Sequence, residues 1–371
     1  MMKTTWLTRL LHSGEMDMLH GSLWDKLTLF ALPLALTGVM QQLFNTADVV
    51  VLGRLVGNEA MAAVGTDVPI IGMVISLFVG LSIGTNVVIA RYIGMGDAEN
   101  ANQAAHTGLV LGLCMGLVVG VLGIAYTDWL IEILDVPAEV RPHAAAYLSM
   151  FCLGMPFVSL YNFSAAIFRA KGDTYTPLWA LVLGSIINLA GNLICAGLFN
   201  LGAGGVALAT AIAYALSTIF LLWRLRVEKG TLHLYYERLL TPHLRKFRAM
   251  IYIGLPAGIQ GMVFSLSNLV IQAAINSLGA AAMAASVAAF TIEINIFCLL
   301  NAYGLAATTF IGQNYGAGNL PRCRQVTRVA LGLDLLCTLF LSALILWWGR
   351  ELLGLFSSNE AVIETGMLRI I

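Results

Sequence analysis

Nine apolar stretches, each of about 20 residues, constrain this chain more than any other feature of its sequence. A helix of that length crosses the ~30 Å hydrocarbon core of a bilayer. No water inside the bilayer can pair with the backbone, so a spanning helix must satisfy its own N–H and C=O groups. The sequence therefore predicts an all-α polytopic membrane protein. We place the membrane helices at 27–53, 68–92, 104–126, 144–168, 177–199, 205–225, 249–276, 283–311 and 325–348, and a tenth begins near Ala361.

The composition excludes several other classes of protein. Hydrophobic residues make up 59% of the 371 residues and charged residues 11%, whereas soluble domains carry roughly 25% charged residues. The formal net charge is zero, so we expect no nucleic-acid partner. No Walker loop of the form GxxxxGKS or GxxxxGKT and no HExxH motif is present. We therefore expect a chain that is not an enzyme, needs no cofactor, and has the lipid bilayer as its surroundings.

Basic residues are distributed unevenly between the two ends of the predicted helices. The N-terminal tail and the loops after helices 2, 4, 6 and 8 hold 16 of the 20 lysines and arginines. Because cytoplasmic loops of membrane proteins carry an excess of Lys and Arg, we expect a multi-pass protein of the cell membrane with a cytoplasmic N-terminus.

Several positions recur at a nearly constant offset. Leu32-Pro33 recurs as Leu255-Pro256, and Asn45 recurs as Asn268, at an offset of 223. At an offset of 222, Gly57, Met61, Gly94 and Gly96 recur as Gly279, Met283, Gly316 and Gly318. Six predicted helices separate equivalent points, so both copies enter the membrane in the same direction. The pattern predicts two parallel six-helix repeats.

The repeat predicts how the chain is divided. We expect a cytoplasmic tail at 1–26, a complete N-lobe with helices 1 to 6 at 27–226, and a cytoplasmic inter-lobe linker at 227–248. A partial C-lobe follows at 249–371, with helices 7 to 9 and the start of helix 10. By the logic of the repeat, the C-lobe is incomplete.

Polar residues inside the apolar stretches are the candidate functional residues. Asp48 stands near the end of the first stretch, and a charge at that depth costs roughly 2.5–3.5 kcal/mol unless it faces protein or water. Burial also makes a carboxyl group a plausible proton carrier. The alternative is a carboxylate that reaches water at the outer interface. Asn188 and Asn192 share one helix face at i and i+4, although buried amides also simply join helices.

A second set of polar residues lies in or near the second repeat. Glu293 and Asp334 are intramembrane acids, for which the alternatives are a salt bridge and a protonated or cleft-facing carboxyl group. Together with Gln42, Asn45 and Asn268, they are our candidates for a substrate site or a second cation site.

The chain resembles the multidrug and toxic compound extrusion (MATE) family, and is nearest to its DinF-like branch. The motifs that carry the resemblance are LPLALTGVMQQLFNTADVVVLGRLVGNEAMAAVG, FRAKGDTYTPLWALVLGSIINLAGN, GGVALATAIAYA and TTFIGQNYGAGN. The resemblance implies a fold of two six-helix lobes that exchanges cytoplasmic drugs or metabolites for Na⁺ or H⁺ by alternating access. It covers helices 1 to 9, and it implies that the chain is C-terminally truncated.

The resemblance also implies a cation or proton site in the N-lobe. In the family this site uses an Asp, a Tyr, an Asn, an acidic residue and a Thr. The matching positions are Asp48, Tyr147, Asn188, Asn192 and Thr210. Asn192 departs from the pattern, because that branch often has Asp there, and the departure leaves the identity of the coupling ion open.

We therefore expect a cation-coupled antiporter, driven by Na⁺ or H⁺, that exports drugs or amphiphilic metabolites as a monomer. Its substrate is expected to be a cationic or neutral amphiphile, because the embedded charges are acidic. One alternative is a lipid-linked oligosaccharide flippase, which by resemblance shares the two-lobe architecture. The other is a truncated fragment without function. In the first helix, Pro33 and Gly38 are the expected place of bending.

Overall fold

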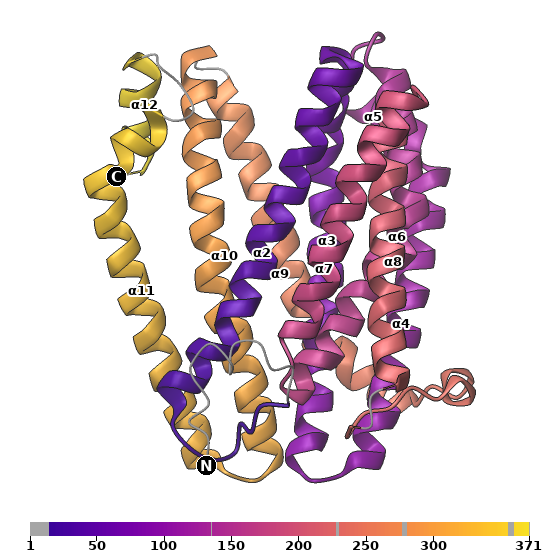
Figure 1. Cartoon of the computed structure of the whole chain (residues 1–371), viewed down its shortest axis with the longest axis vertical. Coiled ribbons are helices and arrows are strands. Elements are labelled where there is room, and N and C mark those ends of the chain that lie inside the picture. The colour runs from indigo at the N-terminus through magenta and orange to yellow at the C-terminus, as the bar shows by residue number, and fades with distance from the viewer. Residues whose placement is uncertain (1–14, 135, 228–229, 277–279, 355–359, 371) are drawn as a thin grey trace.

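The computed structural model describes residues 15–134, 136–227, 230–276, 280–354 and 360–370, which form helices and no strands (Figure 1). Within these residues, nine helical spans are long and apolar enough to cross a membrane. The long helices are α2 (Leu23–Val51), α3 (Asn58–Gly94), α4 (Ala98–Ala125), α6 (Arg141–Lys171), α7 (Tyr175–Asn192), α8 (Gly202–Val227), α9 (Leu244–Asn276), α10 (Ala280–Gly316) and α11 (Leu320–Gly354). Shorter elements are α5 (Thr127–Ile133), α12 (Glu360–Ile370), the 3₁₀ helix η3 (Tyr236–Leu240) and the π-helical segments η1 (Leu52–Val56) and η2 (Leu193–Leu198).

Each of the nine predicted spans falls on one long helical span, so the all-α membrane fold is confirmed. The largest difference is at α3, which begins at Asn58 rather than at 68 and continues through Pro69. Proline removes only one backbone hydrogen bond, and the surrounding turns hold the helix together. Asp67, which the prediction left before the helix, therefore lies inside it. The first 14 residues of the predicted tail lie outside the described residues, and α2 begins within that tail, at Leu23.

Contacts between the two repeats occur in reciprocal pairs. A Cβ atom added at Gly38 of α2 would lie 2.9 Å from the Cβ of Cys298 on α10. A Cβ atom added at Gly261 of α9 would lie 3.0 Å from the Cβ of Ser76 on α3. Gly38 and Gly261 are 223 positions apart, and Ser76 and Cys298 are 222 apart. Equivalent residues thus make equivalent contacts, as expected for parallel repeats related by an axis along the helices.

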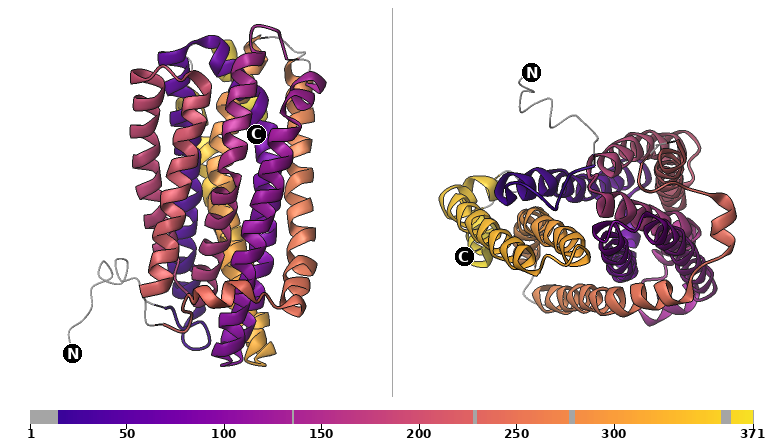
Figure 2. Two further views of the ribbon diagram at one scale, coloured as in Figure 1. Left: turned by 90° about the vertical axis from the view of Figure 1, so that its right-hand side faces the viewer. Right: turned by 90° about the horizontal axis from the view of Figure 1, so that it is seen from below.

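Helix α2 packs on both repeats. In its first half, Leu27 and Phe30 are buried in one cluster with Phe310 of α10. At the C-terminal end of α2, Val51 belongs to a different cluster that includes Leu148 of α6. Figure 1 shows α2 slanting between the two groups of helices, and Figure 2 shows α2 and α9 along opposite flanks of the bundle. Helix α2 therefore bridges the two repeats.

The two repeats approach closely at the end where α3 and α10 terminate. There the backbone of Gly94 meets that of Gln313, and the backbone of Gly316 meets that of Arg91, which is again a reciprocal pair. Small residues allow such backbone contacts between membrane helices. The ribbons of the two repeats diverge toward the opposite end (Figure 1). We call the close-packed end the closed end.

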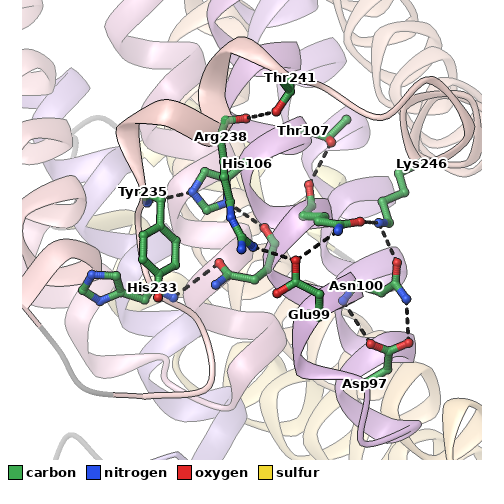
Figure 3. Close-up of polar contacts among 12 residues, drawn as sticks. Asp97, Glu99, Asn100, His106, Thr107, His233, Tyr235, Arg238, Thr241 and Lys246 are labelled. Atoms are coloured by element: carbon green, nitrogen blue, oxygen red, sulfur yellow. Dashed lines mark hydrogen bonds and ion pairs between the residues drawn. The ribbon is translucent and has the colours of Figure 1, made fainter.

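A strap formed by residues 230–243 connects α8 to α9 and is docked on the start of α4 (Figure 3). The backbone N–H of Tyr235 donates to His106 Nε2 at 2.8 Å, and Arg238 pairs with Glu99 at 2.9 Å. Asp97 caps α4, and the hydrogen bonds that it accepts from Asn100 lower the pKa of this carboxyl group. The strap thus fixes the start of α9 to the first repeat.

We expect Lys246→Met to destabilise the protein by about 1.5–3 kcal/mol, the usual contribution of hydrogen bonds to a charged group. Lys246 is 6% exposed, and its Nζ donates to Asn100 Oδ1 at 2.8 Å and to Gln103 Oε1. Thermal unfolding of the detergent-purified protein measures the effect. Arg245→Met is the control, because Arg245 is adjacent and exposed. Equal unfolding temperatures for the two variants would contradict the role of Lys246 in docking.

Candidate cation-binding site

Four polar side chains from three helices meet in the interior of the first repeat. They are Asp48 of α2, Asn188 and Asn192 of α7, and Thr210 of α8, and none is more than 3% exposed. We call these four residues the cradle. The sequence predicted each of them as part of one site, and the structure brings them together.

Hydrogen bonds hold the Asp48 carboxylate on both of its oxygens. Asn192 Nδ2 donates to Oδ1 at 2.6 Å, and Thr210 Oγ1 lies 3.0 Å from Oδ2. Thr210 Oγ1 is also 3.0 Å from the Val206 carbonyl oxygen, so its one proton is shared between two acceptors. Asn188 Nδ2 donates to Thr210 Oγ1 at 3.0 Å. Hydrogen bonds to a charged acceptor contribute roughly 1.5–3 kcal/mol each, which offsets part of the cost of burying Asp48.

Small residues and helix irregularities shape the cradle. A Cβ atom added at Gly191 of α7 would lie 2.9 Å from the Cβ of Ala209 on α8, and this close approach brings the two amides to Thr210. The π-helical segment η2 begins directly after Asn192, and η1 begins one turn after Asp48. Segments η1 and η2 also contact each other. Such π-helical segments are frequent at functional sites, and the sequence pattern did not predict them.

The cradle offers oxygen atoms that suit a small hard cation. Asn192 Oδ1 is buried and has no hydrogen-bond partner within the described part of the chain. Asp48 supplies a carboxylate, and Asn188 and Thr210 add a carbonyl and a hydroxyl oxygen. Carboxylate and carbonyl oxygens are the ligands that hard cations prefer. The arrangement can therefore accept a Na⁺ ion or a proton at Asp48.

Tyr147, the fifth predicted member of the site, lies beside the cradle. Its ring is 4% exposed and stacks on Phe151 with 6.0 Å between ring centroids. The charge of Asp48 acts on its phenol group. None of the hydrogen bonds within the cradle includes Tyr147, so it forms part of the wall.

The structure does not gather the five predicted residues of the second site. Glu293 forms a two-point ion pair with Arg369, at 3.0 and 3.1 Å, which matches the salt-bridge alternative. Asp334 lines a cavity of about 130 Å³ between α10 and α11. Gln42 is half-buried beside Cys298 of α10. Asn45 is exposed and Asn268 is half-buried; these two residues remain candidates only by their place in the repeat.

One buried acid was missed by the sequence analysis. Asp67 of α3 is 0% exposed, which no other acidic residue reaches among those whose burial is described. The signal was available, because Asp67 directly precedes an apolar stretch, but the predicted helix began one residue too late to include it.

The structure is a helical bundle of two related halves, and one half buries an ionisable site. This is the architecture of a membrane transporter. The MatE family model matches residues 33–194 and 256–370, which together are more than half of the chain. The chain therefore belongs to the MatE family of multidrug efflux transporters, and it is a transporter rather than an enzyme. The two matched segments begin at Pro33 and Pro256, which are equivalent positions of the repeat.

Named relatives agree with this family. The chain is 27% identical to a probable multidrug resistance protein, YoeA, of Bacillus subtilis over 350 residues, which cover 92% of this chain and 75% of the relative. It is 27% identical to an FAD transporter of Shewanella oneidensis, with coverage of 89% and 74%. A multidrug resistance MATE family transporter solved in an outward-facing conformation shares the fold, with a TM-score of 0.86, 23% identity and coverage of 95% and 79%. These relatives do not favour the oligosaccharide flippase alternative.

Proposed function

We propose that this protein is an antiporter of the cell membrane that couples export of a small amphiphile to entry of Na⁺ or H⁺ at the cradle. The observation that carries the proposal is the buried Asp48 carboxylate, held by two donors beside Asn192 Oδ1, which has no hydrogen-bond partner among the described residues. A buried ionisable group in a membrane helix marks an ion pathway by default. The exported molecule is a cationic or neutral amphiphile, such as a drug or metabolite.

The distribution of charge supports an orientation with the closed end in the cytoplasm. Lys26 at the start of α2, the strap and the α10–α11 turn all lie at this end, and cytoplasmic segments carry the excess of Lys and Arg. In this orientation the N-terminus is cytoplasmic and the repeats diverge toward the outside. The conformation then corresponds to the outward-facing state of an alternating-access cycle.

Cation binding rearranges the cradle in a defined way. A carboxylate only accepts hydrogen bonds, whereas a protonated carboxyl group donates one. A proton on Asp48 therefore needs an acceptor, and a Na⁺ ion needs further oxygen ligands. In both cases the Asn192 amide turns so that Oδ1 replaces Nδ2. Because α2 packs on both repeats, a change at Asp48 is transmitted to α10 by bending near Pro33 and Gly38.

The coupled cycle follows if ligand binding shifts the populations of the outward-facing and inward-facing states. Cation and substrate need only favour different states for one gradient to drive the other. The cation stabilises the rearranged cradle and releases substrate outward, after which the repeats rock and the cytoplasmic side opens.

Reconstituted protein tests the proposal directly. Ethidium is trapped in proteoliposomes, and an inward gradient of Na⁺ or of H⁺ is imposed separately. We expect one gradient to drive ethidium export and its collapse to stop it. Ethidium export that is independent of both gradients would overturn the proposed coupling. The absence of any export of ethidium or other cationic dyes would overturn the proposed substrate class.

We expect Asn192→Asp to lower the Na⁺ concentration needed for half-maximal export. The new carboxylate would replace an amide whose nitrogen lies 2.6 Å from Asp48 Oδ1. Two carboxylates at that distance repel each other unless a cation or a proton lies between them. Asn200→Asp is the matched control, because Asn200 lies just after η2 and is exposed. If Asn192→Asp changes neither the Na⁺ nor the pH dependence of export, the cradle is not the cation site.

A further inference from the structure

Asp67 is a buried acid of the first repeat that lies outside the cradle. Its side chain is 0% exposed, and neither carboxyl oxygen has a hydrogen-bond partner in the described residues. Asp48, in contrast, accepts hydrogen bonds on both oxygens. Asp48 and Asp67 are therefore both buried, but their hydrogen-bonding environments are opposite.

The neighbours of Asp67 are mainly apolar. On its own helix, Val64 and Ile71 lie one turn before and one turn after it, and both are buried in the cluster that α3 forms with α6. From α6, the titratable groups on which the charge of Asp67 acts are Tyr147 and Cys152. From α2, Asp48 acts on the same Tyr147. Neither lysine nor arginine is among these groups.

An ionised carboxylate in this position would be costly. Without a donor or a positive charge, burial of an ion costs several kcal/mol even after the protein relaxes. A neutral carboxyl group avoids most of this cost. In the conformation described, Asp67 therefore carries its proton, whereas Asp48 has the donors that stabilise an anion.

Asp48 and Asp67 lie on consecutive helices, at similar distances from the turn that joins them. Gly57 forms the turn between α2 and α3, Asp48 stands 9 residues before it and Asp67 stands 10 residues after it. At 1.5 Å per residue, each is roughly 15 Å along its helix from the turn. The charges of both acids act on the phenol group of Tyr147.

We propose that Asp67 is a second coupling site of this transporter, which binds a proton in the outward-facing state and releases it during the cycle. This proposal rests on the proposed antiport. Release breaks the carboxyl O–H bond, passes the proton to water and leaves the Asp67 anion. Water reaches the group only when α3 separates from α6. Helix α3 also forms the closed end with α9, so opening of that end frees α3 to move.

The test combines infrared spectroscopy with transport in the reconstituted protein. A protonated carboxyl group without hydrogen bonds has a C=O stretching band at unusually high frequency. We expect this band at neutral pH, and we expect Asp67→Asn to remove it. Asparagine has the shape of the neutral acid and cannot release a proton, so Asp67→Asn should also change the pH dependence of export. Asp128→Asn removes an exposed acid and is the control for both readouts.

The outcomes separate this proposal from the proposed function. If the band survives in Asp67→Asn, or if the pH dependence of export is unchanged in this variant, the proton site is wrong. Asp67→Glu keeps an ionisable group and should keep both signals, which guards against a purely structural effect. If wild-type protein shows the band but exports nothing, the antiport proposal fails while the protonation of Asp67 stands.

Discussion

Replacing Asp48 by Asn is expected to reduce ion-driven ethidium export to background while the protein still inserts and folds. Asparagine has the size of aspartic acid but cannot carry a negative charge, and its amide nitrogen would face donors rather than acceptors. The lost hydrogen bonds to a charged group cost roughly 1.5–3 kcal/mol. We therefore expect a lower unfolding temperature in a protein that remains monodisperse in detergent.

Ethidium accumulation in cells without endogenous efflux pumps measures this effect. Asp128→Asn is the control, because it removes an equal charge from an exposed position. Asn192→Ala tests the cradle by a second route, since it removes one donor to Asp48 and leaves the carboxylate in place. Undiminished export by Asp48→Asn would remove the cradle from the mechanism.

Three of the four cradle residues could be predicted from sequence because they have local signals. Asp48 is an acid in an apolar stretch, and Asn188 and Asn192 share a helix face. Thr210 has no such signal, and only the resemblance to the MATE family selected it. Its contact with Asp48 spans 162 positions, and a contact of that kind depends on how α2 and α8 pack.

The second predicted site shows where sequence reasoning fails. Glu293 is as clear an intramembrane acid as Asp48, yet its partner is Arg369, which lies 76 positions away on α12. The charge pattern along one helix does not reveal which helix packs against it. Asp67 was missed for a simpler reason, because a helix boundary placed by hydropathy was wrong by about ten residues.

The parallel repeat was predicted from spaced glycines and prolines, and the structure explains why those residues recur. Gly94 and Gly316 are equivalent positions, and each meets the backbone of the other repeat. A side chain at either position would separate the repeats. The position of α2 on both repeats could not be predicted in this way, because the apolar residues of its first half, such as Leu27 and Phe30, carry no signal for the repeat on which they pack.

We expect Gly84→Ala to prevent tight closure of the closed end and to reduce export strongly. A Cβ atom added at Gly84 of α3 would overlap the carbonyl oxygen of Met250 and lie 2.8 Å from the backbone nitrogen of Gly254 on α9. Both neighbours are backbone atoms, so they cannot turn aside as a side chain would. Overpacking of this kind costs roughly 1–3 kcal/mol, which shifts a two-state equilibrium by about 5- to 150-fold. The outward-facing population should fall by such a factor.

Gly72→Ala is the matched control, because Gly72 lies on the same helix and no atom lies within 4 Å of an added Cβ. Alanine favours a helix over glycine by about 0.8–1 kcal/mol, so this variant should be as stable as the wild type or more stable. Spin labels at the exposed Leu240 and Leu320, in a background without native cysteines, report the separation at the closed end. A longer distance in Gly84→Ala, but not in Gly72→Ala, supports a role of this glycine contact in closure. Of the two variants, only Gly84→Ala places a methyl group between α3 and α9. Identical distance distributions in both variants would mean that the glycine contact between these helices does not control closure.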